Sequence, residues 1–317
     1  MAEAASSEGR RGRIVAIDVA RGVALVAMTI YHLSWDLAFF GYLDSSLVGA
    51  RPWILFARAI ATSFLFLVGV SLVLAHGDGV RWRGFSKRLL QVLAGAAAVS
   101  LATWAMDART WVFFGILHAI ALFSVLALPF LRLPWWATAL AAAAIWLVGN
   151  LFVHPLFQTG WLLWIGLAPV PPASNDFVPV LPFFAATLAG IAFARLARRR
   201  GWFDAMRRLP MAWRGAGPLD FIGRHSLLYY LAHQPVLFAI LFAWTFVTGG
   251  PDHVARAERQ WSAECLAARD EAFCKPYVAC VMQEAERRGL LDGLARNRID
   301  DEDREAVASI VTRCAAR

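Results

Sequence analysis

The run from Ile14 to Phe40 is almost continuously apolar and is long enough to cross a lipid bilayer as a single helix. It nevertheless contains ionisable residues, which are costly inside a membrane unless they face the interior of a helix bundle or a wet cavity. One side of the expected helix carries, at alternating steps of four and three residues, Asp18, Gly22, Leu25, Thr29, His32 and Asp36. We therefore expect this helix to form one wall of a functional site.

The rest of the chain supplies further apolar runs of similar length. Of the 317 residues, 59% are hydrophobic and only 17% are charged, a composition typical of multi-span membrane proteins. We predict an all-α integral membrane bundle of about seven transmembrane helices. The apolar run Trp161–Ala168 is too short to be a further span. The expected spans cover residues 14–38, 53–75, 88–107, 111–131, 134–153, 178–196 and 224–247.

The distribution of charge predicts the orientation of the bundle. The formal net charge of +8 comes from the membrane part, whereas residues 249–317 hold 11 Lys and Arg against 13 Asp and Glu. A basic excess in membrane loops indicates topology, so we expect no nucleic-acid partner. Most of the loop Lys and Arg lie before residue 14, in 76–88 and in 195–224. The positive-inside rule places these segments in the cytoplasm, and seven spans then leave the C-terminal tail outside.

Three parts are expected along the chain. We interpret the first apolar run as a retained span rather than a cleaved leader, because it is too long and carries charged residues. The predicted organisation is a cytoplasmic segment over residues 1–13, a seven-span transmembrane domain over 14–247, and a small helical external tail over 248–317.

All four cysteines lie in the tail, at Cys265, Cys274, Cys280 and Cys314. An even set of cysteines in a short external segment predicts disulfide bonds, since that compartment is oxidising. Of the three possible pairings we favour Cys265 with Cys280 and Cys274 with Cys314. The alternative is four buried thiols in a cytoplasmic tail, which would require an even number of spans.

Four candidate residues are expected near the outer leaflet, on three different spans: His32, Asp36, Arg58 and His118. A carboxylate four residues further along a helix can fix the tautomer of an imidazole and raise its basicity. We therefore interpret His32 as a general base oriented by Asp36, with His118 as a further catalytic group. The alternatives are that Arg58 extends to the membrane surface and that His118 is a hydrogen-bonded packing residue.

A second set of candidate residues is expected toward the cytoplasm, where the first span begins and the seventh begins. Alternative interpretations are an ion pair between Asp18 and Arg21, and basic side chains that extend to the interface. There is no close-spaced histidine or cysteine motif, so we expect no metal. The set comprises Asp18, Arg21, Arg224, His225, Ser226 and His233.

Three motifs occur in order along the chain. They are I-D-x-x-R-G-x-A-L-x-x-M followed by H-x-x-W-D-L within residues 17–37, F-G-I-L-H at 114–118, and G-R-H-S-L-L-Y-Y-L-A-H-Q-P at 223–235. Over roughly residues 13–247 the chain resembles the bacterial membrane proteins related to heparan-alpha-glucosaminide N-acetyltransferase. The resemblance implies a multi-pass acyltransferase of the bacterial inner membrane, and the charge distribution places its tail in the periplasm. It would move an acyl group, usually acetyl, from acetyl-CoA to an amine or hydroxyl of an envelope glycan or amino sugar.

The resemblance also suggests roles for the two sets of residues. Arg21, Arg224 and His225 would hold a CoA phosphate on the cytoplasmic side, and the outer set would deprotonate the acceptor. The lysosomal relatives carry their catalytic histidine after the first span, but Leu37–Pro52 contains none here. His32 aligns with an asparagine of the family, so either it has taken over the base role or the activity differs or is absent. The alternatives are a small transporter or flippase and a non-enzymatic scaffold, and an oligomer is compatible with each.

Overall fold

The computed structural model describes residues 14–208, 216–295 and 299–316. The predicted cytoplasmic segment 1–13 lies outside these residues. The chain forms two compact units. Unit 1 comprises residues up to Leu33 together with Gly49–Val236, and unit 2 comprises Ser34–Val48 together with Leu237–Arg317. Each unit is described by itself.

The structure is built from helices, and seven apolar helices occupy the predicted positions of the spans. Five are long and apolar enough to cross a membrane, whereas α6 and α7 have only 11 and 17 residues. The predicted all-α membrane fold is therefore confirmed. The seven helices are α2 (Val15–Phe39), α4 (Arg51–His76), α5 (Trp82–Met106), α6 (Ile116–Leu126), α7 (Trp135–Leu151), α8 (Val180–Arg199) and α11 (Ser226–Thr248).

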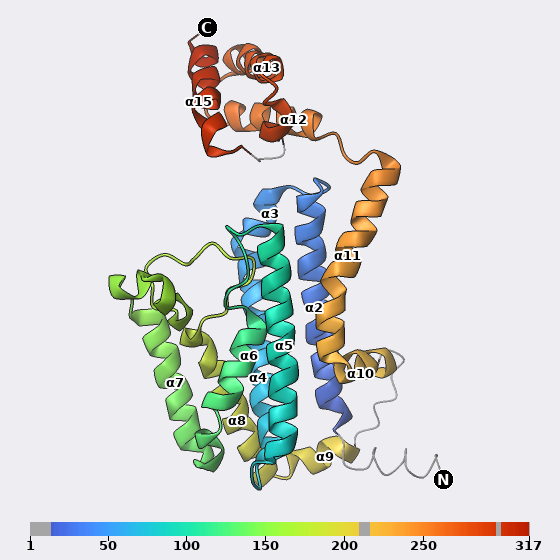
Figure 1. Cartoon of the computed structure of the whole chain (residues 1–317), viewed down its shortest axis with the longest axis vertical. Helices are drawn as coiled ribbons and strands as arrows, with labels where there is room; N and C mark the ends of the chain where they lie inside the picture. Colours follow the sequence, from blue (N-terminus) through green and yellow to red (C-terminus); the bar gives the residue numbers. More distant parts are fainter. Residues whose placement is uncertain (1–13, 209–215, 296–298, 317) are drawn as a thin grey trace. The chain divides into compact units, whose positions relative to one another are not determined.

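Helix α8 is the centre of unit 1 and packs most extensively against α4 and α7 (Figure 1). Its residues Leu188, Ile191 and Ala194 have no exposed surface, as expected for a helix surrounded by other helices. The crossing with α4 is close because each helix has a glycine at the contact. A Cβ on Gly69 would collide with the carbonyl of Thr187, and one on Gly190 with that of Phe66.

The fourth apolar helix begins later than the residue 111 predicted from the sequence. Gly115 is its N-cap, and the backbone N–H of Ile116 donates to Asp176 Oδ2 over 2.7 Å. Phe114 is extended, and its carbonyl accepts from the N–H of Val178. A carboxylate from a distant loop thus satisfies one of the free N–H groups in the first turn of α6.

Short helices fill the connections of unit 1. The Pro- and Trp-rich segment after α7 forms two 3-10 helices, η2 (Pro155–Gln158) and η3 (Gly160–Ile165), in place of a further span. A third 3-10 helix, η1 (Pro129–Arg132), follows α6. Helix α9 (Trp202–Arg208) continues from the end of α8.

A separate helix, α10 (Ala216–Arg224), precedes the seventh span. The sequence placed Arg224 and His225 at the start of that span, whereas Arg224 ends α10 and His225 lies in the turn before α11. Two glycines bring α10 against α2. A Cβ on Gly22 would collide with the carbonyl of Leu219, and one on Gly223 with the carbonyl of Asp18.

Unit 2 contains the helical tail predicted from the sequence. Three of its helices have an aspartate N-cap, at Asp252, Asp270 and Asp300, whose side chain accepts a backbone N–H of the first turn. A small core gathers around Val281 and Ile310. Besides the ends of α2 and α11, the helices are α3 (Ser45–Gly49), α12 (His253–Leu266), α13 (Glu271–Arg287), α14 (Leu291–Ala295) and α15 (Asp301–Ala315).

Both disulfide bonds are present in the tail, but the favoured pairing is wrong. The structure pairs Cys265 with Cys274 and Cys280 with Cys314. A short connection joins α12 to α13, so the last turn of one lies beside the first turn of the other and brings Cys265 to Cys274. Cys280 lies six residues further along α13, on a different face, where it meets the last turn of α15.

Candidate functional site

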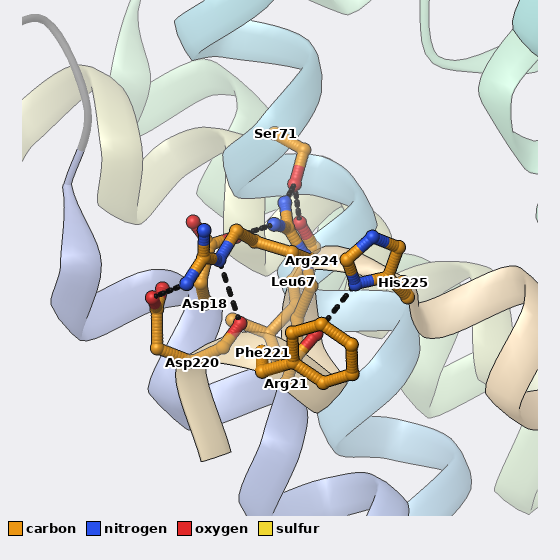
Figure 2. Close-up of polar contacts among 8 residues, drawn as sticks. All are labelled: Asp18, Arg21, Leu67, Ser71, Asp220, Phe221, Arg224 and His225. Carbon is orange, nitrogen blue, oxygen red and sulfur yellow. Dashed lines mark hydrogen bonds and ion pairs between the residues drawn. The ribbon is translucent and has the colours of Figure 1, made fainter. Parts of the chain in front are cut away.

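Two polar regions lie along α2 in unit 1, and the first is at its beginning. Arg21 donates to Asp18 Oδ1 over 2.6 Å and to Ser71 Oγ of α4 over 2.5 Å (Figure 2). Asp18 is only 5% exposed. The ion-pair interpretation of these two residues is therefore what the structure shows, and the pair also joins α2 to α4.

Helix α10 adds a second ion pair to this region (Figure 2). Arg224 pairs with Asp220 Oδ2 one turn earlier. Asp220 Oδ1 is buried, and none of the described residues donates a hydrogen bond to it. His225 Nδ1 lies 3.0 Å from the carbonyl oxygen of Phe221, so it donates, because a carbonyl oxygen only accepts. The arginine cluster, as we call Asp18, Arg21, Ser71, Asp220 and Arg224, thus contains two acid–base pairs.

A further cation lies next to the arginine cluster. Arg88 of α5 is close enough to Arg21 for the two guanidinium charges to repel each other. Arg195, Arg198 and Arg199, at the end of α8, repel one another in the same way. Arg198 pairs with Asp78, whereas no carboxylate of the described residues pairs with Arg88, Arg195 or Arg199.

The second polar region is a pair of histidines between α2 and α11. The ring centroids of His32 and His233 are 5.1 Å apart. His233 Nδ1 lies 2.6 Å from the carbonyl oxygen of Tyr230, so Nδ1 carries the proton and donates it to that oxygen. In the neutral ring Nε2 then has a free lone pair. That atom is buried, and no described residue hydrogen-bonds to it.

Two tyrosines hold the His233 ring. The Tyr229 ring is parallel to it, with 2° between the planes, and the Tyr230 ring is tilted against it. Thr29 Oγ1 donates to the carbonyl of Leu25, so the Tyr229 hydroxyl donates to Thr29 over 2.8 Å. This bond links α2 to α11 beside the histidine pair. Thr29 belongs to the stripe predicted on α2, whereas the two tyrosines were not among the predicted site residues.

His118 lies in a different environment from His32. Its Nδ1 accepts the N–H of Gly115, and its Nε2 lies 3.3 Å from Ser100 Oγ, which itself donates to the carbonyl of Val112. Both ring nitrogens are therefore engaged in bonds that hold the start of α6. Within the described residues no hydrogen bond or ring contact joins His118 to His32.

Asp176 is a residue that the sequence interpretation did not select. It precedes α8 and accepts the N–H of Ile116. Burial of the carboxyl raises its pKa to about 6, while the hydrogen bond from Ile116 acts in the opposite direction. Its charge also interacts with the hydroxyl of Tyr230, which contacts His233. A signal was present in the sequence, since Asp176 is the only acidic residue between Asp107 and Asp204.

The remaining predicted residues are more scattered. Asp36 is buried, 4% exposed, one turn beyond His32 in α2, and belongs to unit 2. Arg58 is exposed on α4. Ser226 begins α11. No group of three or more His, Cys, Asp or Glu side chains that could hold a metal ion occurs in the described part of the chain.

The family model described as heparan-alpha-glucosaminide N-acetyltransferase, catalytic, matches residues 13–235. The chain belongs to this family. The match covers both polar regions and ends just after His233, so the tail lies outside it. No curated protein and no solved structure matches the chain.

Membership of this family confirms the resemblance drawn from the three motifs, although it ends at residue 235 rather than near 247. The structure brings together residues from two of those motifs. His32 comes from the first and His233 from the third, and their depth along the helices had assigned them to different sets. The hydrogen bond between Thr29 and Tyr229 sets the register of α11 along α2, so that His233, two turns into α11, comes level with His32.

Proposed function

We propose that this protein is a membrane-bound acyltransferase that moves an acyl group, in the simplest case acetyl, from acyl-CoA to an amine or hydroxyl of an envelope sugar. Its family supports acyl transfer as the class of reaction. The observation that carries the proposal for this chain is the His233 ring, whose Nδ1–H is held by a backbone carbonyl while Nε2 keeps a free lone pair. A general base needs this arrangement.

The proposed reaction is a single acyl transfer. His233 Nε2 takes the proton of the acceptor amine or hydroxyl as its nitrogen or oxygen attacks the thioester carbonyl. The new carbon–nitrogen or carbon–oxygen bond forms, the carbon–sulfur bond breaks, and CoA leaves as a thiolate that regains a proton. His32, the nearest ring, would position the acceptor or share the proton. The base role predicted for His32, with Asp36 as its orienting group, thus passes to His233 in this proposal.

The donor would enter from the side that carries the positive excess. Arg88, Arg195 and Arg199 are the groups suited to the CoA phosphates, because Arg21, Arg198 and Arg224 already pair with carboxylates. By the positive-inside rule this side faces the cytoplasm, with the disulfide-bonded tail in the periplasm. The acceptor would then be presented from the opposite side of the inner membrane.

Two measurements test the proposal. Purified protein in lipid nanodiscs should release free CoA from labelled acetyl-CoA when a glucosamine-containing acceptor is present. Envelope glycans from cells with and without the protein should differ by the mass of one acyl group. Intact acetyl-CoA and unchanged glycans would contradict the proposal, and altered export of a solute under those conditions would favour a transporter.

A further inference from the structure

The arginine cluster contains one polar atom that the protein leaves unsatisfied. Asp220 Oδ2 is bound by Arg224, whereas Asp220 Oδ1 is buried and receives no hydrogen bond from any described residue. A buried carboxylate oxygen without a donor is costly, and such an atom in a native structure calls for an explanation. A ligand that brings an N–H or O–H group would remove this cost.

The position of Asp220 is fixed by close packing. The carbonyl of its neighbour Leu219 lies against Gly22 of α2, and Gly223 lies against the carbonyl of Asp18. Neither glycine has room for a side chain, so α10 cannot move away from α2 without losing this contact. The Asp220 side chain is 16% exposed, so part of the carboxylate reaches the surface although its Oδ1 is buried.

The charge of the atom restricts what it can bind. A carboxylate oxygen repels a phosphate and accepts only from a donor. In the acyl donor of the proposed reaction, the phosphates lie at one end and the thioester at the other, and the pantetheine arm between them carries amide N–H and hydroxyl groups. Asp220 lies six residues before Ser226, the first residue of α11, and seven further residues, or about 10 Å of helix, separate Ser226 from His233.

We infer that Asp220 Oδ1 accepts a hydrogen bond from an N–H or O–H group of the pantetheine arm of acyl-CoA. This inference rests on the proposed function for the identity of the ligand. It assigns to Asp220 a substrate-binding role, and it replaces the expectation that Arg224 holds a phosphate. Arg224 instead orients the carboxylate, leaving the second oxygen for the donor.

An asparagine substitution tests the inference because it reverses the polarity of one atom. In Asp220→Asn the side-chain oxygen must face Arg224, which only donates, and the NH2 group then occupies the place of Oδ1. A donor of the arm would meet another donor. Asp220→Ala removes both atoms and leaves no such conflict. We therefore expect the asparagine variant to bind the arm less well than the alanine variant, although it keeps the contact with Arg224.

The measurement is equilibrium binding of CoA and of adenosine 3′,5′-bisphosphate, which lacks the arm, to the full-length protein in nanodiscs. We expect Asp220→Asn to weaken CoA binding by about 10- to 100-fold and to leave binding of the bisphosphate unchanged. Asp107→Asn is the matched control, since Asp107 also pairs with an arginine next to the end of a span. Size-exclusion elution and the thermal unfolding temperature of each variant establish that it is folded.

Three results would overturn the inference. The first is an equal loss of affinity for CoA and for the bisphosphate, which would place the contact on the nucleotide. The second is a larger loss of CoA affinity in Asp220→Ala than in Asp220→Asn, which would indicate a structural role. The third is a lack of CoA binding by the unmodified protein. Binding requires no turnover. A protein that shows the expected binding pattern but transfers no acyl group would keep the inference and contradict the proposed function.

Discussion

The arginine cluster and the histidine pair each include residues of α2, but the polar groups of the first are paired, whereas one ring nitrogen of the second keeps a lone pair available. At the start of α2, the Arg21 and Arg224 guanidinium groups each meet a carboxylate. Further along, two imidazole rings face each other, and His233 Nε2 is left without a donor among the described residues. Charges in a membrane protein must be paired to be tolerated, whereas a base must keep a lone pair available. The comparison therefore separates residues that hold helices together from residues suited to chemistry.

The largest effect is expected from the histidine pair. His233→Gln should lower the rate of acyl transfer by about 10²- to 10⁴-fold, since this is the usual contribution of a general base. The rate of acyl transfer is measured as turnover of labelled acetyl-CoA by the protein in nanodiscs. His154→Gln is the control, because His154 lies in an exposed loop. A His233→Gln variant that inserts normally and keeps full activity would remove the histidine pair from the chemistry.

Substitutions in the arginine cluster should lower the stability of the protein. Asp18→Ala leaves Arg21 without its carboxylate and should reduce the free energy of unfolding by about 3–5 kcal/mol, because one partner of a buried pair is lost. Replacing both, in Asp18→Leu with Arg21→Met, should recover much of this loss. Unfolding in mixed detergent micelles provides the measurement. If Asp18→Ala is as stable as the unmodified protein, the cluster does not hold α2 in place.

Asp176 offers a third case, a buried carboxyl whose hydrogen-bond partner in the described structure is a backbone N–H, that of Ile116. Its folded-state pKa of about 6 is above the usual 3.8, so the folded state binds the proton more tightly than the unfolded state. Stability should therefore be highest below about pH 4 and fall by about 2–3 kcal/mol as the pH rises to 6, with no further change from this group above that. Asp176→Asn should remove this decline while retaining the hydrogen bond to Ile116. An unchanged pH profile in the variant would contradict the assignment.

The smallest effect concerns the orientation of the His233 ring. Tyr229→Phe removes the hydrogen bond to Thr29 but keeps the parallel ring, so it should lower kcat by about 3- to 10-fold, the equivalent of about 1 kcal/mol. Tyr42→Phe is the matched control, because its hydroxyl also bonds a threonine, Thr245, in unit 2. Equal effects of the two substitutions would mean that the Tyr229 bond contributes only stability.

Part of the site follows from sequence because its signal is local. The stripe on α2, the pairing of Asp18 with Arg21 and the aspartates that begin the tail helices depend on residues three or four apart. The contact between His32 and His233 could not be predicted in this way, because it depends on the register of two helices about 200 residues apart in the sequence. Depth estimated from helix starts separated them, because the register that the bond between Thr29 and Tyr229 sets was not anticipated.

The sequence by itself determined which parts of the chain lie in the lipid bilayer and which lie in water. The signals are apolar runs long enough for a bilayer, a basic excess in their loops, and cysteines confined to the tail. These are sums over many residues, so single errors cancel. Only the tertiary structure decided which cysteines pair, that Asp176 caps α6, and that one oxygen of Asp220 receives no hydrogen bond from the described residues. Each of these depends on the relative rotation of packed helices, where a shift of one residue turns a side chain by about 100°.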